Sequence, residues 1–76
     1  MNVTVKFFAA LREQVGRDSL NISLGDDHSV QAVWREATSQ PLDPHVLVAI
    51  NQEYASREST VADGDEIAFF PPVTGG

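Results

Sequence analysis

The sequence predicts one small α+β domain, in which a mixed β-sheet is covered on one face by a single main helix. Three observations support this prediction. The 76-residue chain is 42% apolar, which is enough for one hydrophobic core and too much for a disordered chain. Apolar residues alternate with polar ones near both ends of the chain, as in strands with one buried face. Between these segments lies one amphipathic stripe at helical spacing.

The N-terminal third of the chain predicts a strand, a short helix and a second strand. Residues 2–7 alternate between polar and apolar side chains, so the chain begins with a strand that has one buried face. Residues 9–15 predict a short helix that ends at Gly16, because glycine is common at helix C-termini. Alternation over residues 20–24 predicts a second strand, which we expect to pair antiparallel with the first.

The middle of the chain predicts the main helix. Ser29 is a favourable N-cap, and four apolar residues then follow at the i, i+3, i+4 and i+7 spacing of one helix face. These four residues are Val30, Val33, Trp34 and Ala37. We expect the helix to end near residue 39 or 40, because Pro41 disfavours helical geometry in the residue before it.

The remaining residues predict three more strands. Residues 46–50 are apolar throughout, as in an inner strand, and residues 51–53 predict a turn. A short edge strand is expected over residues 57–61. An Asp-Gly pair, a strong tight-turn signal, then precedes the last strand over residues 66–70, which two prolines terminate.

This order of elements describes the ubiquitin-like β-grasp, in which a hairpin is followed by a crossing helix and the final strand lies beside the first. A ferredoxin-like split βαβ arrangement is the alternative, but the short first helix and the late edge strand fit it less well. The sequence therefore divides into a β-grasp domain, residues 1–70, and a flexible, extended C-terminal tail, residues 71–76.

Charge and composition narrow the classes of function. The chain has 11 Asp and Glu against 5 Lys and Arg, so its net charge is −6. Nucleic acid and anionic membranes are therefore poor partners, and a basic protein surface is a better one. The chain has no cysteine, which excludes disulfides and thiolate nucleophiles. Because the sequence shows neither a signal peptide nor a membrane span, we expect a cytoplasmic protein.

The sequence shows no arrangement of residues typical of catalysis or metal binding. His28 and His45 lack the spacing of metal ligands. There is no nucleophile–base pair, no glycine-rich phosphate loop and no pair of catalytic carboxylates. We therefore expect no metal site, no cofactor bound by this chain, and no catalysis by the chain alone.

The C-terminal segment FFPPVTGG, residues 69–76, carries the main functional signal. Glycine has no Cβ, so Gly75 and Gly76 allow the backbone to pass a narrow channel and bring the terminal carboxylate into another protein's active site. A frayed terminus is the alternative interpretation of two glycines. Residues 71–76 can extend roughly 20 Å.

The other residues of the tail have separate expected roles. Pro71 and Pro72 would stiffen its base in an extended form, which lowers the entropy lost on insertion. Val73 and Thr74 would contact the mouth of the channel. Gly76 would be the reacting residue, since its carboxylate is the end of the chain.

The strand before the tail predicts a docking surface. Alternation places Phe69 on one face of this strand and Phe70 on the other, so one aromatic faces the core and the other lies near the surface. We expect Phe70 to contact a partner protein, and Phe8 at the end of the first strand to do the same. A small satellite core is the alternative for both residues.

Two parts of the chain resemble a known protein family. The segment DGDEIAFFPPVTGG, residues 63–76, resembles the C-terminal signature of the MoaD type of the MoaD/ThiS family, the small sulfur-carrier subunit of molybdopterin synthase. The segment from Phe7 to Gly16 resembles that family's first strand and helix. The related thiamin-pathway carriers also end in two glycines but usually lack the FFPP run.

The resemblance implies a mechanism in which Gly76 carries sulfur. An ATP-using, E1-like enzyme adenylates the terminal glycine, and sulfur from a separate donor system then displaces AMP to leave a thiocarboxylate. The tail enters the large subunit of the synthase, where the sulfur passes to a cyclic pyranopterin precursor in molybdenum cofactor biosynthesis. The resemblance also implies a heterotetramer of two small and two large subunits.

Other functions stay open at this point. A ubiquitin-like protein modifier would use the same terminal carboxylate to form isopeptide bonds, and covalent adducts would reveal it. A thiamin-pathway sulfur carrier would form the same thiocarboxylate. A plain β-grasp interaction domain would have an inert tail, and would keep its function when the two glycines are deleted.

Overall fold

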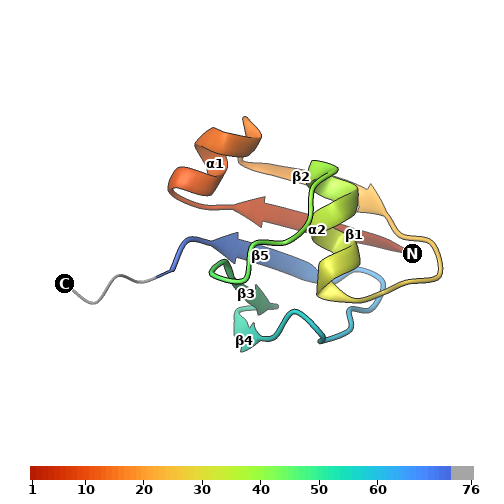
Figure 1. Ribbon diagram of the computed structural model, residues 1–76. Helices are drawn as coiled ribbons and strands as arrows, with labels where there is room; N and C mark the ends of the chain where they lie inside the picture. The colour runs from red at the N-terminus through yellow and green to blue at the C-terminus, as the bar shows by residue number, and fades with distance from the viewer. Residues whose placement is uncertain (73–76) are drawn as a thin grey trace.

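The computed structural model describes residues 1–72 of the chain. Two helices and five strands follow one another in these residues (Figure 1). They are β1 (Asn2–Phe7), α1 (Ala10–Val15), β2 (Ser19–Ser23), α2 (Val30–Thr38), β3 (Leu47–Ile50), β4 (Glu53–Ala55) and β5 (Glu66–Phe70). The strands form one sheet in the order β2-β1-β5-β3-β4. The central pair β1 and β5 is parallel, and the other pairs are antiparallel. This mixed sheet with its covering helix confirms the predicted β-grasp fold.

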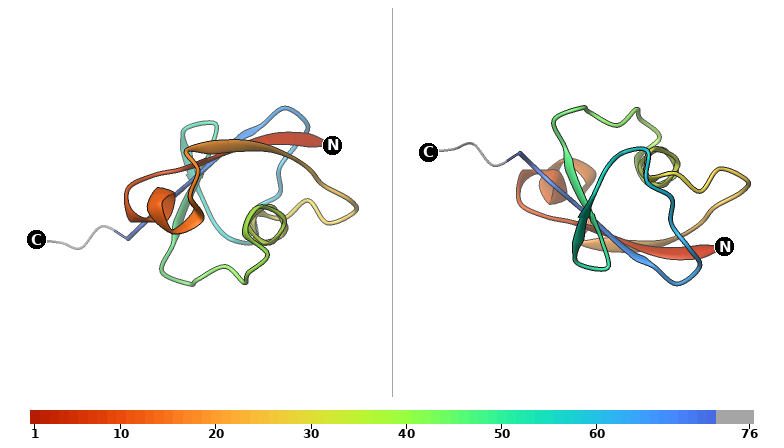
Figure 2. Two further views of the ribbon diagram at one scale, coloured as in Figure 1. Left: turned by 90° about the horizontal axis from the view of Figure 1, so that it is seen from above. Right: turned by 90° about the horizontal axis from the view of Figure 1, so that it is seen from below.

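Both helices lie on the same side of the sheet. The left view of Figure 2 shows α2 end-on beneath the strands, with α1 and the segment that joins α2 to β3 on the same side. Because β1 and β5 run parallel, the end of β5 lies beside the start of α1, far from the N-terminus (Figure 1). Pro71 and Pro72, which follow β5, therefore lie at the α1 end of the sheet.

The core lies between the sheet and α2, and three aromatic rings form its centre. The Trp34 ring meets Phe69 edge-on at a centroid distance of 4.9 Å and Phe7 at 6.0 Å. The Trp34 indole N–H donates to the carbonyl of Pro41 at 3.2 Å, so its polar atom is paired. The predicted stripe of α2 is confirmed, since Val30, Val33 and Trp34 are all buried.

The ends of α2 are those predicted from the sequence. The Ser29 hydroxyl accepts a hydrogen bond from the N–H of Ala32 at 3.1 Å, which satisfies one free donor of the first turn. Before the helix, the Asp27 carboxylate accepts from the N–H of Ser29, and this bond lowers the pKa of Asp27. The helix ends at Thr38, and its C-cap Ser39 has a left-handed backbone with φ of 60°.

The predicted edge strand over residues 57–61 is wrong. The edge strand is β4, Glu53–Ala55, which pairs with β3 directly after a two-residue turn. Residues Asn51 and Gln52 form this turn with φ of 51° and 71°, and positive φ at both positions is typical of a type I′ hairpin. Glu53 therefore belongs to the strand and not to the turn.

Residues 56–61 form a turn and one isolated bridge in place of the expected strand. The backbone N–H of Ser56 donates to the Ser59 hydroxyl at 3.0 Å, which closes the turn. Thr60 then forms a single antiparallel bridge with Ser29. This bridge joins the segment to the start of α2, and the segment is not part of the five-stranded sheet.

The junction between β1 and α1 holds an alanine in an unfavourable conformation. Ala9 has φ of 52° and ψ of −131°, and the N–H of Leu11 donates to the carbonyl of Phe8 at 3.1 Å. These angles match the first central position of a type II′ turn, where glycine is normal because a Cβ is crowded there. Residue 9, expected to begin the helix, therefore precedes it.

We expect Ala9→Gly to stabilise the protein. Such a sparsely populated backbone conformation costs a residue that has a Cβ about 1–3 kcal/mol, while a glycine adds about 0.5–1 kcal/mol of entropy cost, so the net gain is up to about 2.5 kcal/mol. Thermal denaturation should show a higher Tm, by about 4–8 °C for each kcal/mol gained. The control is Ala10→Gly inside α1, which should lower Tm. A fall in Tm for both variants would show that Ala9 is not strained.

Candidate functional site

The sheet face opposite α2 carries an apolar surface, which we call the open-face patch. Alternation along the strands places its members on this face, because their neighbours Phe7, Val48 and Phe69 point into the core. The patch consists of Phe8, Leu47, Ala49, Tyr54, Ala68 and Phe70. It thus combines residues from the ends of β1 and β5 with residues of β3 and β4.

The register of the strands brings these residues together. Leu47 lies opposite Phe70, and Ala49 lies between Ala68 and Tyr54. The rings of Tyr54 and Phe70 are 5.8 Å apart between centroids and tilted by 56°. The backbone N–H of Phe8 donates to the carbonyl of Phe69 at 3.1 Å, which continues the ladder past β1 and places Phe8 beside Phe70.

The aromatic side chains of the open-face patch are accessible to solvent. Tyr54 is 79% exposed, Phe8 is 48% exposed and Phe70 is half-buried. Neighbouring aromatics exposed on a small domain are typical of a protein–protein interface. Lys6 and Glu66 form an ion pair at 3.3 Å on the same sheet face and border the patch with opposite charges. The patch is therefore suited to a protein surface that buries aromatic rings.

The base of the predicted tail adjoins this patch. β5 ends at Phe70, and Pro71, which is half-buried, and Pro72, which is exposed, follow it directly. The expected tail residues Val73, Thr74, Gly75 and Gly76 lie outside the described residues. The structure thus brings Phe8, Phe70, Pro71 and Pro72 to one end of the molecule.

Tyr54 and β3 contribute surface that the sequence interpretation missed. Because the edge strand was predicted over residues 57–61, Tyr54 was not assigned to any strand or to either face of the sheet. The signal that would have found it is the two-residue turn after a buried strand, because pairing across such a turn puts Tyr54 opposite Ala49. Leu47 and Ala49 were missed because residues 46–50 are apolar throughout, so the sequence does not show which of them face away from the core.

Asp27 and Asp65 have carboxylates that stabilise local structure by accepting backbone hydrogen bonds. The Asp65 carboxylate accepts from the N–H of Ala62 at 2.8 Å and from the Asn51 amide at 2.9 Å. The backbone bond from Ala62 is the main cause of a lowered pKa at Asp65.

Among residues 1–72, no three His, Asp or Glu side chains are placed to hold a metal ion. No helix in this part of the chain is long and apolar enough to cross a bilayer.

Comparison with known protein families shows to which family the chain belongs. The family model described as the ThiS family matches residues 5–76. The chain belongs to the ThiS family. This membership confirms the resemblance seen in the two segments of the sequence, and extends it across the region between them.

Curated ThiS-family relatives match along almost their whole length. The molybdopterin synthase sulfur carrier subunit of Haemophilus influenzae is 46% identical, and the match covers 97% of this chain and 99% of the relative. The protein of the same name from Escherichia coli is 40% identical, again with 97% and 99% covered.

Solved structures confirm the ThiS-family fold. SAMP1 of Haloferax volcanii superposes with a TM-score of 0.81 at 29% identity, and the match covers 100% of both chains. The small archaeal modifier protein 1 of Methanosarcina acetivorans has a TM-score of 0.79 at 28% identity, with 99% of this chain and 96% of that chain covered.

Proposed function

We propose that this protein is the sulfur-carrier subunit of a molybdopterin synthase. The observation that carries the proposal is the 46% identity along nearly the full length of a curated sulfur carrier subunit. The open-face patch beside the base of the tail supports it, because a carrier has to be held by other proteins while its end reacts. We place the protein in the cytoplasm, where ATP is available for activation.

The proposed chemistry takes place at the carboxylate of Gly76. A carboxylate is a poor electrophile until one oxygen becomes part of a leaving group. An E1-like enzyme supplies this when the carboxylate attacks the α-phosphorus of ATP and releases pyrophosphate, forming an acyl adenylate. A persulfide of the sulfur donor then attacks the carbonyl carbon and AMP leaves, which gives an acyl disulfide. A thiol attacks the donor's own sulfur in this acyl disulfide, so that a disulfide forms on the donor and the thiocarboxylate of Gly76 is released. The chain itself needs no bound cofactor for these steps.

The partner that receives the loaded tail is the large subunit of the synthase, in a proposed assembly of two small and two large subunits. Val73 and Thr74 would contact the channel mouth, and Gly75 and Gly76 would pass its narrowest part. Sulfur would then move from the thiocarboxylate to a cyclic pyranopterin precursor, and water would regenerate the carboxylate. The open-face patch would hold the domain on the large subunit.

The direct test is the intact mass of the protein after incubation with the activating enzyme, ATP and a sulfur source. The expected shift corresponds to one oxygen replaced by one sulfur, located in the C-terminal peptide by fragmentation. The charged protein should then convert the pyranopterin precursor when the large subunit is added. A mass that does not change, or sulfur located elsewhere in the chain, would contradict the proposal.

We expect Phe70→Ala to weaken binding to the large subunit by about tenfold or more, because a partly exposed aromatic beside Tyr54 has the features of an interface hot spot. Titration calorimetry measures the affinity, and thermal denaturation measures the cost to the fold. The control is Ser19→Ala on β2, at the far edge of the same sheet face, which should leave affinity within about twofold of the wild type. A larger loss of stability than of binding would assign Phe70 to the core.

A protein modifier is the second candidate function. Small archaeal modifier protein 3 of Haloferax volcanii is 32% identical, and the match covers 100% of both proteins. A modifier would join its C-terminus to lysines of other proteins through isopeptide bonds. A tagged chain that accumulates in cells as covalent adducts resistant to thiols would favour this function, whereas free protein bearing a thiocarboxylate would favour the sulfur carrier. Use of the sulfur for a thiazole in place of the pyranopterin would indicate the thiamin pathway.

A further inference from the structure

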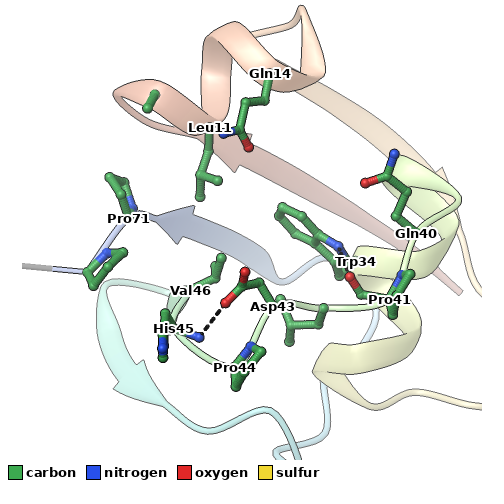
Figure 3. A pocket seen from close by; sticks show the side chains of 13 residues that line it. Leu11, Gln14, Trp34, Gln40, Pro41, Asp43, Pro44, His45, Val46 and Pro71 are labelled. Carbon is green, nitrogen blue, oxygen red and sulfur yellow. Dashed lines mark hydrogen bonds between the residues drawn. The ribbon is translucent and has the colours of Figure 1, made fainter.

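A groove lies on the opposite side of the sheet from the open-face patch and reaches the base of the tail. It is a cavity of about 710 Å³ between α1 and the segment that joins α2 to β3. We call it the tail-base groove and define it by the residues that the argument uses. These are Leu11, Gln14, Trp34, Asp43, Val46 and the pair Pro71 and Pro72. Figure 3 shows Leu11 and Gln14 pointing into it from α1, with Trp34 and Val46 across from them.

The surface of this groove is mainly apolar. Leu11 and Trp34 form its deep part, and the Trp34 indole N–H is already paired with the carbonyl of Pro41. Val46 and the two prolines add aliphatic surface, and the exposed side chains of Gln14, Gln40 and His45 add polar groups to the lining. Among the described residues that line the groove, Asp43 is the only acidic one and no Lys or Arg is present. The groove thus combines apolar walls with one negative charge at its edge.

The tail determines what can lie over this groove. Residues 73–76, which connect Pro72 to the proposed reacting carboxylate, span at most about 14 Å when fully extended. If Gly76 has to enter an enclosed active site, the mouth of that site has to come close to Pro72. Pro71 and Pro72 form one wall of the tail-base groove, so the surface around the mouth lies over the groove as well.

We propose that the tail-base groove receives an apolar side chain from the rim of the channel in the large synthase subunit, with a basic group of that subunit facing Asp43. This inference rests on the proposed function, because it takes the large subunit as the protein that holds the tail. The charge agrees, since a chain of net charge −6 favours a basic partner surface. The domain is then held on both sides of the tail base, by the open-face patch and by the groove.

The first test fills the groove. Gln14→Trp places a large ring at its edge, and its control is Glu13→Trp, the preceding exposed residue on α1, which does not line the groove. A Glu13→Gln variant gives the effect of losing that charge alone. We expect Gln14→Trp to raise Kd for the large synthase subunit at least tenfold, and Glu13→Trp to match Glu13→Gln within about twofold. Thermal denaturation checks that each variant is folded.

The second test removes the charge. Asp43→Asn retains a side-chain oxygen to accept from the N–H of His45, a bond of 2.7 Å in the structure. We expect it to raise Kd about threefold or more at low salt, and the difference to shrink at high salt where charges are screened. Glu36→Gln on the exposed side of α2 removes the same charge away from the groove and is the control.

The outcomes separate this inference from the proposed function. If the wild type forms the thiocarboxylate and binds the large subunit, but Gln14→Trp binds as well as its control, the groove inference is wrong and the proposed function stands. If wild-type protein neither accepts sulfur nor binds the large subunit, both are wrong. A large effect of Gln14→Trp together with no effect of Asp43→Asn would retain the apolar contact and reject the basic group.

Discussion

Removal of Gly75 and Gly76 is expected to abolish sulfur transfer and to leave the free energy of unfolding unchanged. The truncated chain ends at Thr74, so its carboxylate stops about 7 Å short of its former reach and follows a branched side chain. Because misplacing a reacting group by about 1 Å can cost 10²-fold, transfer should fall by at least that factor. Intact mass after activation and a single-turnover assay with the large subunit measure the loss.

We expect this deletion to leave the folded domain and its free energy of unfolding unchanged. β5 ends at Phe70, and the buried core contains no residue beyond Phe69 among those that the structure describes. Urea unfolding should give the same midpoint as the wild type, and the open-face patch should still bind the large subunit. A truncated protein that supports cofactor assembly at the normal rate would show that the tail is inert and that the domain acts only by binding.

Phe69→Ala is expected to have the largest effect on stability. Phe69 is fully buried and packs against Trp34 at 4.9 Å and Phe7 at 6.2 Å between centroids. Truncation of a buried phenylalanine costs about 3–5 kcal/mol. A domain of this length has about 4–11 kcal/mol in total, so a large part of the stability would be lost. Urea unfolding followed by tryptophan fluorescence measures the loss through Trp34.

The matched control is Phe70→Ala, the same change one residue later on the opposite face of β5. Phe70 is half-buried and contacts the exposed Tyr54, so we expect a cost below about 1.5 kcal/mol. Losses of equal size would show that both faces of β5 are core. The open-face patch would then not be available to a partner.

Periodicity was sufficient to predict the elements that have one buried face. The alternation in residues 2–7 and 66–70 predicted β1 and β5, and the stripe that includes Trp34 predicted α2 together with its packing. The same alternation placed Phe69 and Phe70 on opposite faces of the strand, and the structure shows that Phe69 is the one in the core. In the structure the last strand lies beside the first, and this pairing brings Phe8 close to Phe70, which was not predicted from the sequence.

The sequence was insufficient where local signals are weak or where the feature is tertiary. The turn formed by Asn51 and Gln52 contains no glycine, so there was no strong sequence signal for its positive φ angles. The edge strand was therefore predicted over residues 57–61, after its true position. Tyr54 was missed for this reason. The tail-base groove joins α1, the segment before β3 and the tail base, which no local pattern connects.

The position of β5 has a mechanical consequence. This strand is bonded on one side to β1 and on the other to β3, and the tail leaves from its end. A pull on the C-terminus along the strand loads both ladders in shear, so many hydrogen bonds share the force and would have to break together. In the proposed function, the tail would therefore be pulled into the large subunit and released again in repeated cycles while the domain stays folded.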